Sequence, residues 1–173
     1  MRNLLNGTLV NIVQSQVGWF ACVLSAAADQ AWVGLAVVGA LILAHVVRSE
    51  QPKRELGLVL VAAAAGALVD TLLVQIGAVN FASSDVSGLS PAWMIALWAI
   101  FATTLRHSLS WLQSRLALSA LIAAIGATLA YAAGARLGAL QILDARSAYL
   151  AIGALWALAL PALLWIARRL RPR

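Results

Sequence analysis

Charged residues are scarce in this chain, and their scarcity excludes a water-soluble globular domain. Of the 173 residues only 10% are charged, whereas 63% are hydrophobic, and the mean hydropathy is +0.92. Soluble domains carry about a quarter charged residues, so this chain cannot cover a folded surface with polar groups. The apolar excess indicates an integral membrane protein.

Cysteine and the short motifs of several enzyme classes are also missing. The single cysteine, Cys22, excludes an intramolecular disulfide and a metal site built from several cysteines. The sequence contains no H-E-x-x-H zinc motif, no G-x-S-x-G nucleophile motif and no phosphate-binding glycine loop. We therefore expect no bound metal and no cofactor. The sequence leaves open whether the protein is an enzyme.

The charges that are present are mostly basic, with 12 Lys and Arg against 6 Asp and Glu. A basic excess can indicate nucleic-acid binding, but these residues lie between apolar runs and not on a polar face. A membrane protein explains that placement better. We expect membrane lipids as partners, and no nucleic acid.

Apolar runs divide the chain into six predicted transmembrane helices within one domain. A helix rises about 1.5 Å per residue, so about 20 residues cross the hydrocarbon core. The clearest span begins at Pro91 and has Trp93 and Trp111 near its two ends, as expected at membrane interfaces. The predicted fold is an all-α, six-helix bundle with spans at approximately residues 4–27, 31–47, 56–77, 91–112, 115–134 and 149–170.

Basic residues are distributed unequally between the two ends of these spans. If the N-terminus is cytoplasmic, ten Lys and Arg fall on that side, and only Arg136 and Arg146 fall on the other. The positive-inside rule then predicts that both termini are cytoplasmic. The alternative, a cleaved signal peptide ending near residue 28, is less favoured because Asn and Gln interrupt its apolar run.

The first predicted span carries an unusual polar face. Asn11 and Gln14 belong to a series of polar and small residues at steps of three and four, which places them on one side of a helix. Amides are costly against lipid, so this face should point inward. Two interpretations stay open: hydrogen bonds between helices, or the polar wall of a cavity.

Asp70 is the only acid well inside a predicted span. An unpaired carboxylate at that depth needs a partner. A functional role would be proton coupling, cation binding or substrate contact, as is usual for intramembrane acids. The structural alternative is a hydrogen bond to one of four polar residues: Gln14, Gln16, Gln75 or Tyr131.

A second polar group is expected near the cytoplasmic ends of the helices. His45, Arg106 and His107 fall at similar depth there. Arg106 would either neutralise Glu50 or Glu55, or bind a lipid phosphate together with a histidine. We expect structural roles for the histidines rather than catalysis.

Trp98 differs from the other tryptophans. Most of the seven are explained by membrane interfaces and by helix packing. Trp98 lies midway along the fourth span, so we expect it to pack inside the bundle or to line a pocket.

Three segments resemble a known family: QVGWFACVL, GALVDTLLVQIGAVNF around Asp70, and PAWMIALWAIFATTLRHSLSWL. They are similar to a bacterial multi-pass membrane family called domain of unknown function 2878. The resemblance implies an inner-membrane protein of unassigned activity. It also implies a role in membrane-lipid modification or its stress response, because members tend to be encoded beside fatty-acyl-modifying methyltransferases and flavin oxidoreductases. It supplies no catalytic residues.

These observations favour a non-catalytic bacterial inner-membrane protein that binds a lipid or another apolar ligand. It would act beside a lipid-modifying enzyme, and a homo-oligomer is compatible with the sequence. The alternatives are a lipid-acting enzyme, with Asp70 or His107 as acid–base group, and a small proton-coupled transporter using Asp70. The candidate ligand-binding residues are Asn11, Gln14, His45, Asp70, Trp98, Arg106, His107 and Tyr131.

Overall fold

A computed structural model describes residues 2–84 and 86–170, with side chains from residue 7 onward. Over these residues the chain forms six α-helices, one 3₁₀ helix and a two-stranded antiparallel sheet. In chain order the elements are α1 (Arg2–Ala27), α2 (Ala31–Arg48), α3 (Pro52–Gln75), β1 (Val79–Phe81), α4 (Ala92–Ala102), η1 (Ser110–Ser114), α5 (Leu116–Arg136), β2 (Leu140–Ile142) and α6 (Ala145–Arg169).

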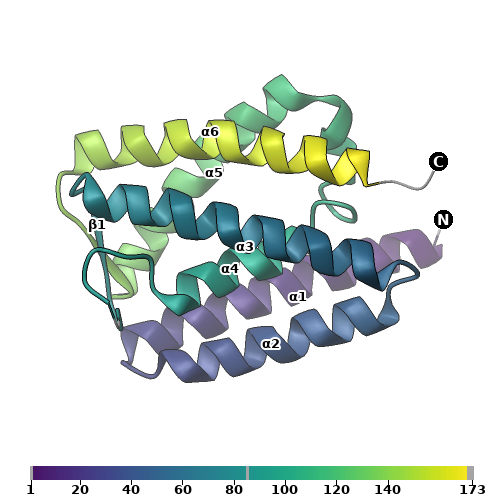
Figure 1. The fold of residues 1–173 in the computed structure, drawn as a ribbon, viewed down its shortest axis with the longest axis horizontal. Helices are drawn as coiled ribbons and strands as arrows, with labels where there is room; N and C mark the ends of the chain where they lie inside the picture. The colour runs from purple at the N-terminus through teal and green to yellow at the C-terminus, as the bar shows by residue number, and fades with distance from the viewer. Residues whose placement is uncertain (1, 85, 171–173) are drawn as a thin grey trace.

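The long helices run alternately up and down, so the bundle has two distinct ends (Figure 1). The start of α1, the end of α6 and the α2–α3 connection lie at one end, and β1 lies at the other. The short helix α4 packs against α1, α2 and α3, while α5 packs mainly against α6. The helices therefore form a four-helix group around α4 and a pair, α5 and α6; α6 contacts this group along α3 and through side chains of α4.

The outer surface of the long helices is apolar. Among the described residues, the five α-helices other than α4 are long and apolar enough to cross a membrane. Many large apolar side chains point outward from them, for example Trp32, Leu129 and Leu158, which are 69%, 65% and 73% exposed. An outward apolar surface of this extent is stable only against lipid. The structure thus supports a multi-helix membrane protein.

The fourth helix is where structure and sequence expectation differ most. A continuous helix over residues 91–112 was expected, but α4 ends at Ala102, after 11 residues or about 16 Å of rise. Thr103 and Thr104 end it because their hydroxyls donate to the carbonyls of Ile100 and Phe101, both at 2.7 Å. These side-chain bonds compete with helical pairing, and residues 103–109 continue as tight turns.

The sheet is a second departure from the all-α expectation. Val79, Asn80 and Phe81 pair with Ile142, Gln141 and Leu140, which connects the α3–α4 loop to the α5–α6 loop. Strands of three residues carry no periodic signal, so the sequence pattern did not predict them.

The remaining helix boundaries differ less. Helix α3 begins at Pro52, four residues earlier than expected, and Pro91 is the residue just before α4 instead of lying in its first turn. A tight turn connects α1 to α2, with Asp29 at a φ of 56°.

Candidate functional site

A cavity of about 510 Å³ lies among α1, α4, α5 and α6. Ligand pockets typically enclose 300–1,000 Å³, so this cleft is large enough for a small molecule or part of a lipid. Its lining is almost entirely apolar and includes Trp19, Met94, Leu97, Trp98, Phe101, Leu109, Ala127, Ala130, Tyr131, Trp156 and Leu160.

The cleft opens between α1 and α5. Helix α1 packs mainly against α2 and α4, and α5 mainly against α6, so α1 and α5 flank the cleft without packing closely on each other. The exposed residues in the lining are Gln16 on α1 and Ile122, Gly126 and Leu129 on α5. Because both helices present apolar side chains outward, this mouth faces lipid and not water.

Aromatic rings form the inner wall of the cleft. The indoles of Trp98 and Trp156 stack with ring centres 4.0 Å apart, and Phe101 meets Trp156 edge-on at 5.5 Å. Trp98 also packs directly on α3 at Gly66, where an added Cβ would lie 2.0 Å from the indole Cγ. Only glycine fits this position, because the Trp98 ring lies directly against the α3 backbone there.

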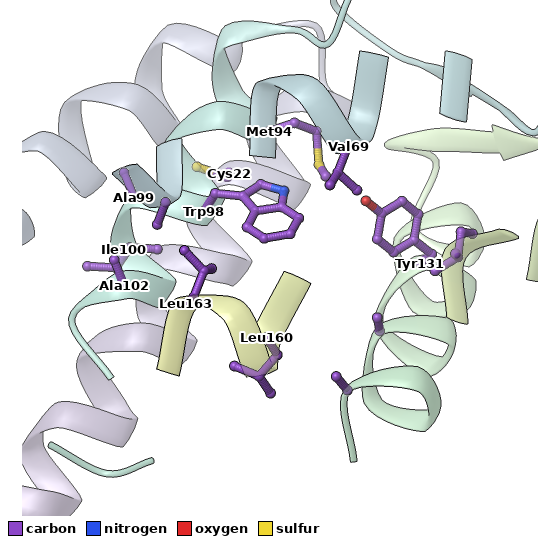
Figure 2. Close-up of a cluster of buried hydrophobic side chains, with 14 of the residues drawn as sticks. Cys22, Val69, Met94, Trp98, Ala99, Ile100, Ala102, Tyr131, Leu160 and Leu163 are labelled. Carbon is purple, nitrogen blue, oxygen red and sulfur yellow. The ribbon is translucent and has the colours of Figure 1, made fainter. Parts of the chain in front are cut away.

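Asp70 lies behind this wall and is fully buried. Trp98 Nε1 donates to its Oδ2 at 2.8 Å, and the Tyr131 hydroxyl donates to its Oδ1. Figure 2 shows the Trp98 and Tyr131 rings, with the tyrosine hydroxyl pointing toward Val69 on α3. The structural alternative for Asp70 therefore has a partner among those expected, Tyr131. Asp70 is not part of the cleft lining.

The indole N–H of Trp156 is buried in the cleft wall. Trp156 Nε1 lies beside the Tyr131 hydroxyl but makes no hydrogen bond of normal geometry within the described chain. Ser15 and Gln16 add polar groups on the α1 side. The cleft thus combines a large apolar wall with a few polar positions, the usual pattern of a ligand pocket.

The polar face of α1 serves helix packing. Asn11 is buried; its amide donates to the Thr103 carbonyl at 3.1 Å and accepts the Ser108 hydroxyl at 2.7 Å. Gln14 donates to the Leu41 carbonyl of α2 at 2.7 Å. Neither residue lines the cleft. Their contacts support the helix–helix interpretation over the cavity-wall interpretation.

A cluster of ionisable side chains lies near the end of the bundle that holds both termini, and Glu55 is at its centre. Arg106 Nη1 lies 3.0 Å from Glu55 Oε1, which identifies Glu55 and not Glu50 as the partner of this arginine. His45 and His107 approach the same carboxylate at 3.3 and 3.7 Å. None of these residues lines the cleft, so the eight candidate residues divide among three places.

Sequence reasoning missed several contributors. Trp156 was assigned with the interfacial and packing tryptophans, but its indole forms part of the cleft wall. Gln113 is buried and donates to the Leu105 carbonyl at 2.8 Å, supporting the turns after α4. The only signal for Trp156 was its size, and Gln113 lay in the short connection predicted between the spans at 91–112 and 115–134. The role of Trp156 depends on the packing of α6 against α4, and that of Gln113 on where α4 ends.

The fold and this cleft define a multi-helix membrane protein with a laterally open apolar pocket. The sequence model of the family described as protein of unknown function (DUF2878) matches residues 8–162, so the chain belongs to that family. Neither a curated protein nor a solved structure matches the chain.

Proposed function

We propose that this protein binds a membrane lipid by taking an acyl chain into the cleft between α1 and α5. The observation that supports it is the lateral mouth: a cavity of about 510 Å³ with apolar walls, flanked by helices whose outer faces are themselves apolar. A ligand that enters from this side comes from the bilayer, and acyl chains are what the bilayer offers there.

Polar groups in the cleft would orient that lipid. The side chains of Ser15 and Gln16 can hydrogen-bond an ester carbonyl or a head-group oxygen. The aromatic wall supplies contact area with little rotamer freedom to lose. Apolar walls with a few placed polar groups favour recognition of a lipid over non-specific lipid contact.

Gly126 provides a sharp test because an added Cβ there has no atom within 4 Å. Gly126→Phe should fill the cleft without disturbing helix packing. Gly39→Phe on α2 is the matched control, since Gly39 is also exposed with open space around it and lies outside the cleft. Crosslinking to a phospholipid with a photoreactive acyl chain, in vesicles, should fall several-fold in the first variant only. Equal crosslinking in wild type and Gly126→Phe would refute the proposal.

We propose in addition that the protein acts beside a lipid-modifying enzyme. A deletion strain should show an altered lipid profile that wild type restores and Gly126→Phe does not. Unchanged lipids in the deletion strain would remove the lipid-modifying partner from the proposal while leaving the crosslinking result to decide lipid binding. The homo-oligomer stays a prediction.

The enzyme and transporter alternatives have less support. Both oxygens of Asp70 accept hydrogen bonds from Trp98 and Tyr131, and the side chain is fully buried behind the cleft wall. Proton transfer or acid–base catalysis requires contact with water or substrate, and such contact would require Trp98 or Tyr131 to move.

We also propose the bacterial inner membrane as the location, with both termini cytoplasmic. The start of α1 and the end of α6 lie at the same end of the bundle (Figure 1). The ten-to-two excess of basic residues on that side supports a cytoplasmic assignment.

A further inference from the structure

Two histidines and a glutamate from three separate segments converge near the end of the bundle that holds both termini. His45 lies in the last turn of α2, Glu55 in the first turn of α3, and His107 in the turns after α4. One potential ligand atom from each lies within 4.8 Å of the others. This convergence is independent of the cleft and of the proposed lipid binding.

We propose that His45, Glu55 and His107 form a binding site for a divalent transition metal, with Zn²⁺ the best match. Two imidazoles and one carboxylate are the donor set of several catalytic zinc sites, which keep a further position open for water. This proposal departs from the sequence-based expectation of no bound metal, which rested on the absence of any metal-ligand motif. Only the packing of α2, α3 and the turns after α4 brings them together.

The distances are close to those a zinc ion needs. Tetrahedral bonds of about 2.1 Å place neighbouring ligand atoms about 3.4 Å apart. His45 Nε2 lies 3.3 Å from Glu55 Oε2, and His107 Nε2 lies 3.7 Å from Glu55 Oε1. The three ligand atoms lie within 4.8 Å of one another, so the widest pair must approach by up to about 1.4 Å to complete the tetrahedral set. The His107 side chain is 43% exposed, so it can make this movement.

The three proposed ligands differ in how exposed their side chains are. The His45 and Glu55 side chains are 9% and 4% exposed, whereas His107 reaches the surface. A metal held here would have two fixed ligands and one adjustable ligand. Its remaining coordination position would face solvent beside His107.

Arg106 is the competing cation. Its Nη1 lies 3.0 Å from Glu55 Oε1, but this buried nitrogen makes no hydrogen bond of normal geometry in the described chain. Its Nη2 donates to Gln51 Oε1 at 3.2 Å. The guanidinium is therefore an imperfect partner for Glu55 and is tethered to Gln51. We infer that a metal takes over the carboxylate while Arg106 keeps its contact with Gln51.

The test uses the full chain in detergent with a tag that contains no histidine. The chain has only two histidines and one cysteine, and the cysteine is buried. Zinc binding is measured against a chromophoric chelator, and Co²⁺ absorption reports the coordination geometry. Wild type should bind one ion per chain. His107→Ala, at a half-exposed position that tolerates substitution, should bind at least about tenfold more weakly, and His45→Ala should behave likewise.

Arg106→Gln separates a metal site from a purely ionic cluster. Removing the competing cation should tighten zinc binding several-fold, although it removes an ion pair. Ser114→Ala, at an exposed position on η1 outside the cluster, is the control and should bind like wild type. Thermal unfolding of each variant checks that it is folded. Absence of stoichiometric binding in both wild type and Arg106→Gln would overturn the proposal, as would binding that survives loss of both histidines.

Discussion

At the scale of single residues, the fit between Gly66 and Trp98 determines how closely α3 and α4 pack. Trp98 is 1% exposed, and its ring occupies the space where a Cβ on Gly66 would be. The same ring donates to Asp70 one turn further along α3. The Trp98 side chain therefore requires a residue without a Cβ at position 66 and a hydrogen-bond acceptor at position 70.

Gly66→Ala should therefore destabilise the protein, although alanine is normally the better helix former. The expected loss is about 1–3 kcal/mol from overpacking against the indole. Gly57→Ala in the same helix is the control, because an added Cβ there meets no atom within 4 Å. The control should be neutral or more stable by up to about 1 kcal/mol. Unfolding in mixed detergent and denaturant measures both, and equal stability of the two variants would contradict the assignment.

The Tyr131 hydroxyl should also stabilise the fold, since it is one of two donors to a fully buried carboxylate. Tyr131→Phe leaves one oxygen of Asp70 without its partner and should cost about 1–3 kcal/mol. Tyr149→Phe is the matched control because the Tyr149 hydroxyl forms no hydrogen bond within residues 2–84 and 86–170. Its expected change is below about 0.5 kcal/mol. In an Asp70→Ala background, which removes the acceptor, the Tyr131→Phe cost should shrink; an unchanged cost would mean that the two side chains do not interact.

At the scale of elements, the interrupted fourth helix is the defining feature. Non-helical backbone at membrane depth is tolerated only where protein groups satisfy it. Asn11 and Gln113 supply donors to the carbonyls of Thr103 and Leu105. The buried amides of Asn11 on α1 and Gln113 on η1 are therefore explained by the backbone that α4 leaves unpaired.

Asn11→Ala should weaken this segment. It removes the donor to the Thr103 carbonyl and the acceptor of the Ser108 hydroxyl, at an expected cost of about 1–3 kcal/mol. Gln16→Ala removes an exposed amide of the same helix and should change stability little. Hydrogen exchange should show faster exchange at residues 103–109 in the first variant alone. A uniform change across all helices would argue against a local role for Asn11.

At the scale of the whole molecule, the even number of helices places both chain ends on one side if each helix, with α4 extended by its turns, crosses the bilayer. The β1–β2 pair joins the C-terminal ends of α3 and α5 at the end of the bundle away from the chain termini (Figure 1). The side of the membrane on which each connection lies therefore tests this arrangement directly.

Cysteine labelling provides that test, because Cys22 is the only native cysteine and is buried. In a Cys22→Ala background, Lys53→Cys and Arg169→Cys should be protected from an impermeant maleimide added to intact cells. Asn80→Cys and Gln141→Cys, which face each other across the two strands, should react. Labelling of Lys53→Cys and Arg169→Cys from opposite sides would overturn the topology.

The sequence by itself determined the class of protein, the family resemblance and the approximate positions of five long helices. Hydrophobic content and length are local properties, so they can be read without knowing what packs against what. The need of Asp70 for a partner was also predictable, because a buried carboxylate is costly anywhere in the chain.

Tertiary structure decided which residues form the cleft, where α4 ends and which groups meet at Glu55. Trp156 and Trp98 are 58 positions apart along the chain, and they stack only because α6 and α4 come together. His45, Glu55 and His107 likewise converge only after α2, α3 and the turns beyond α4 have packed. Such contacts depend on helix orientation and spacing, and hydrophobic periodicity specifies neither.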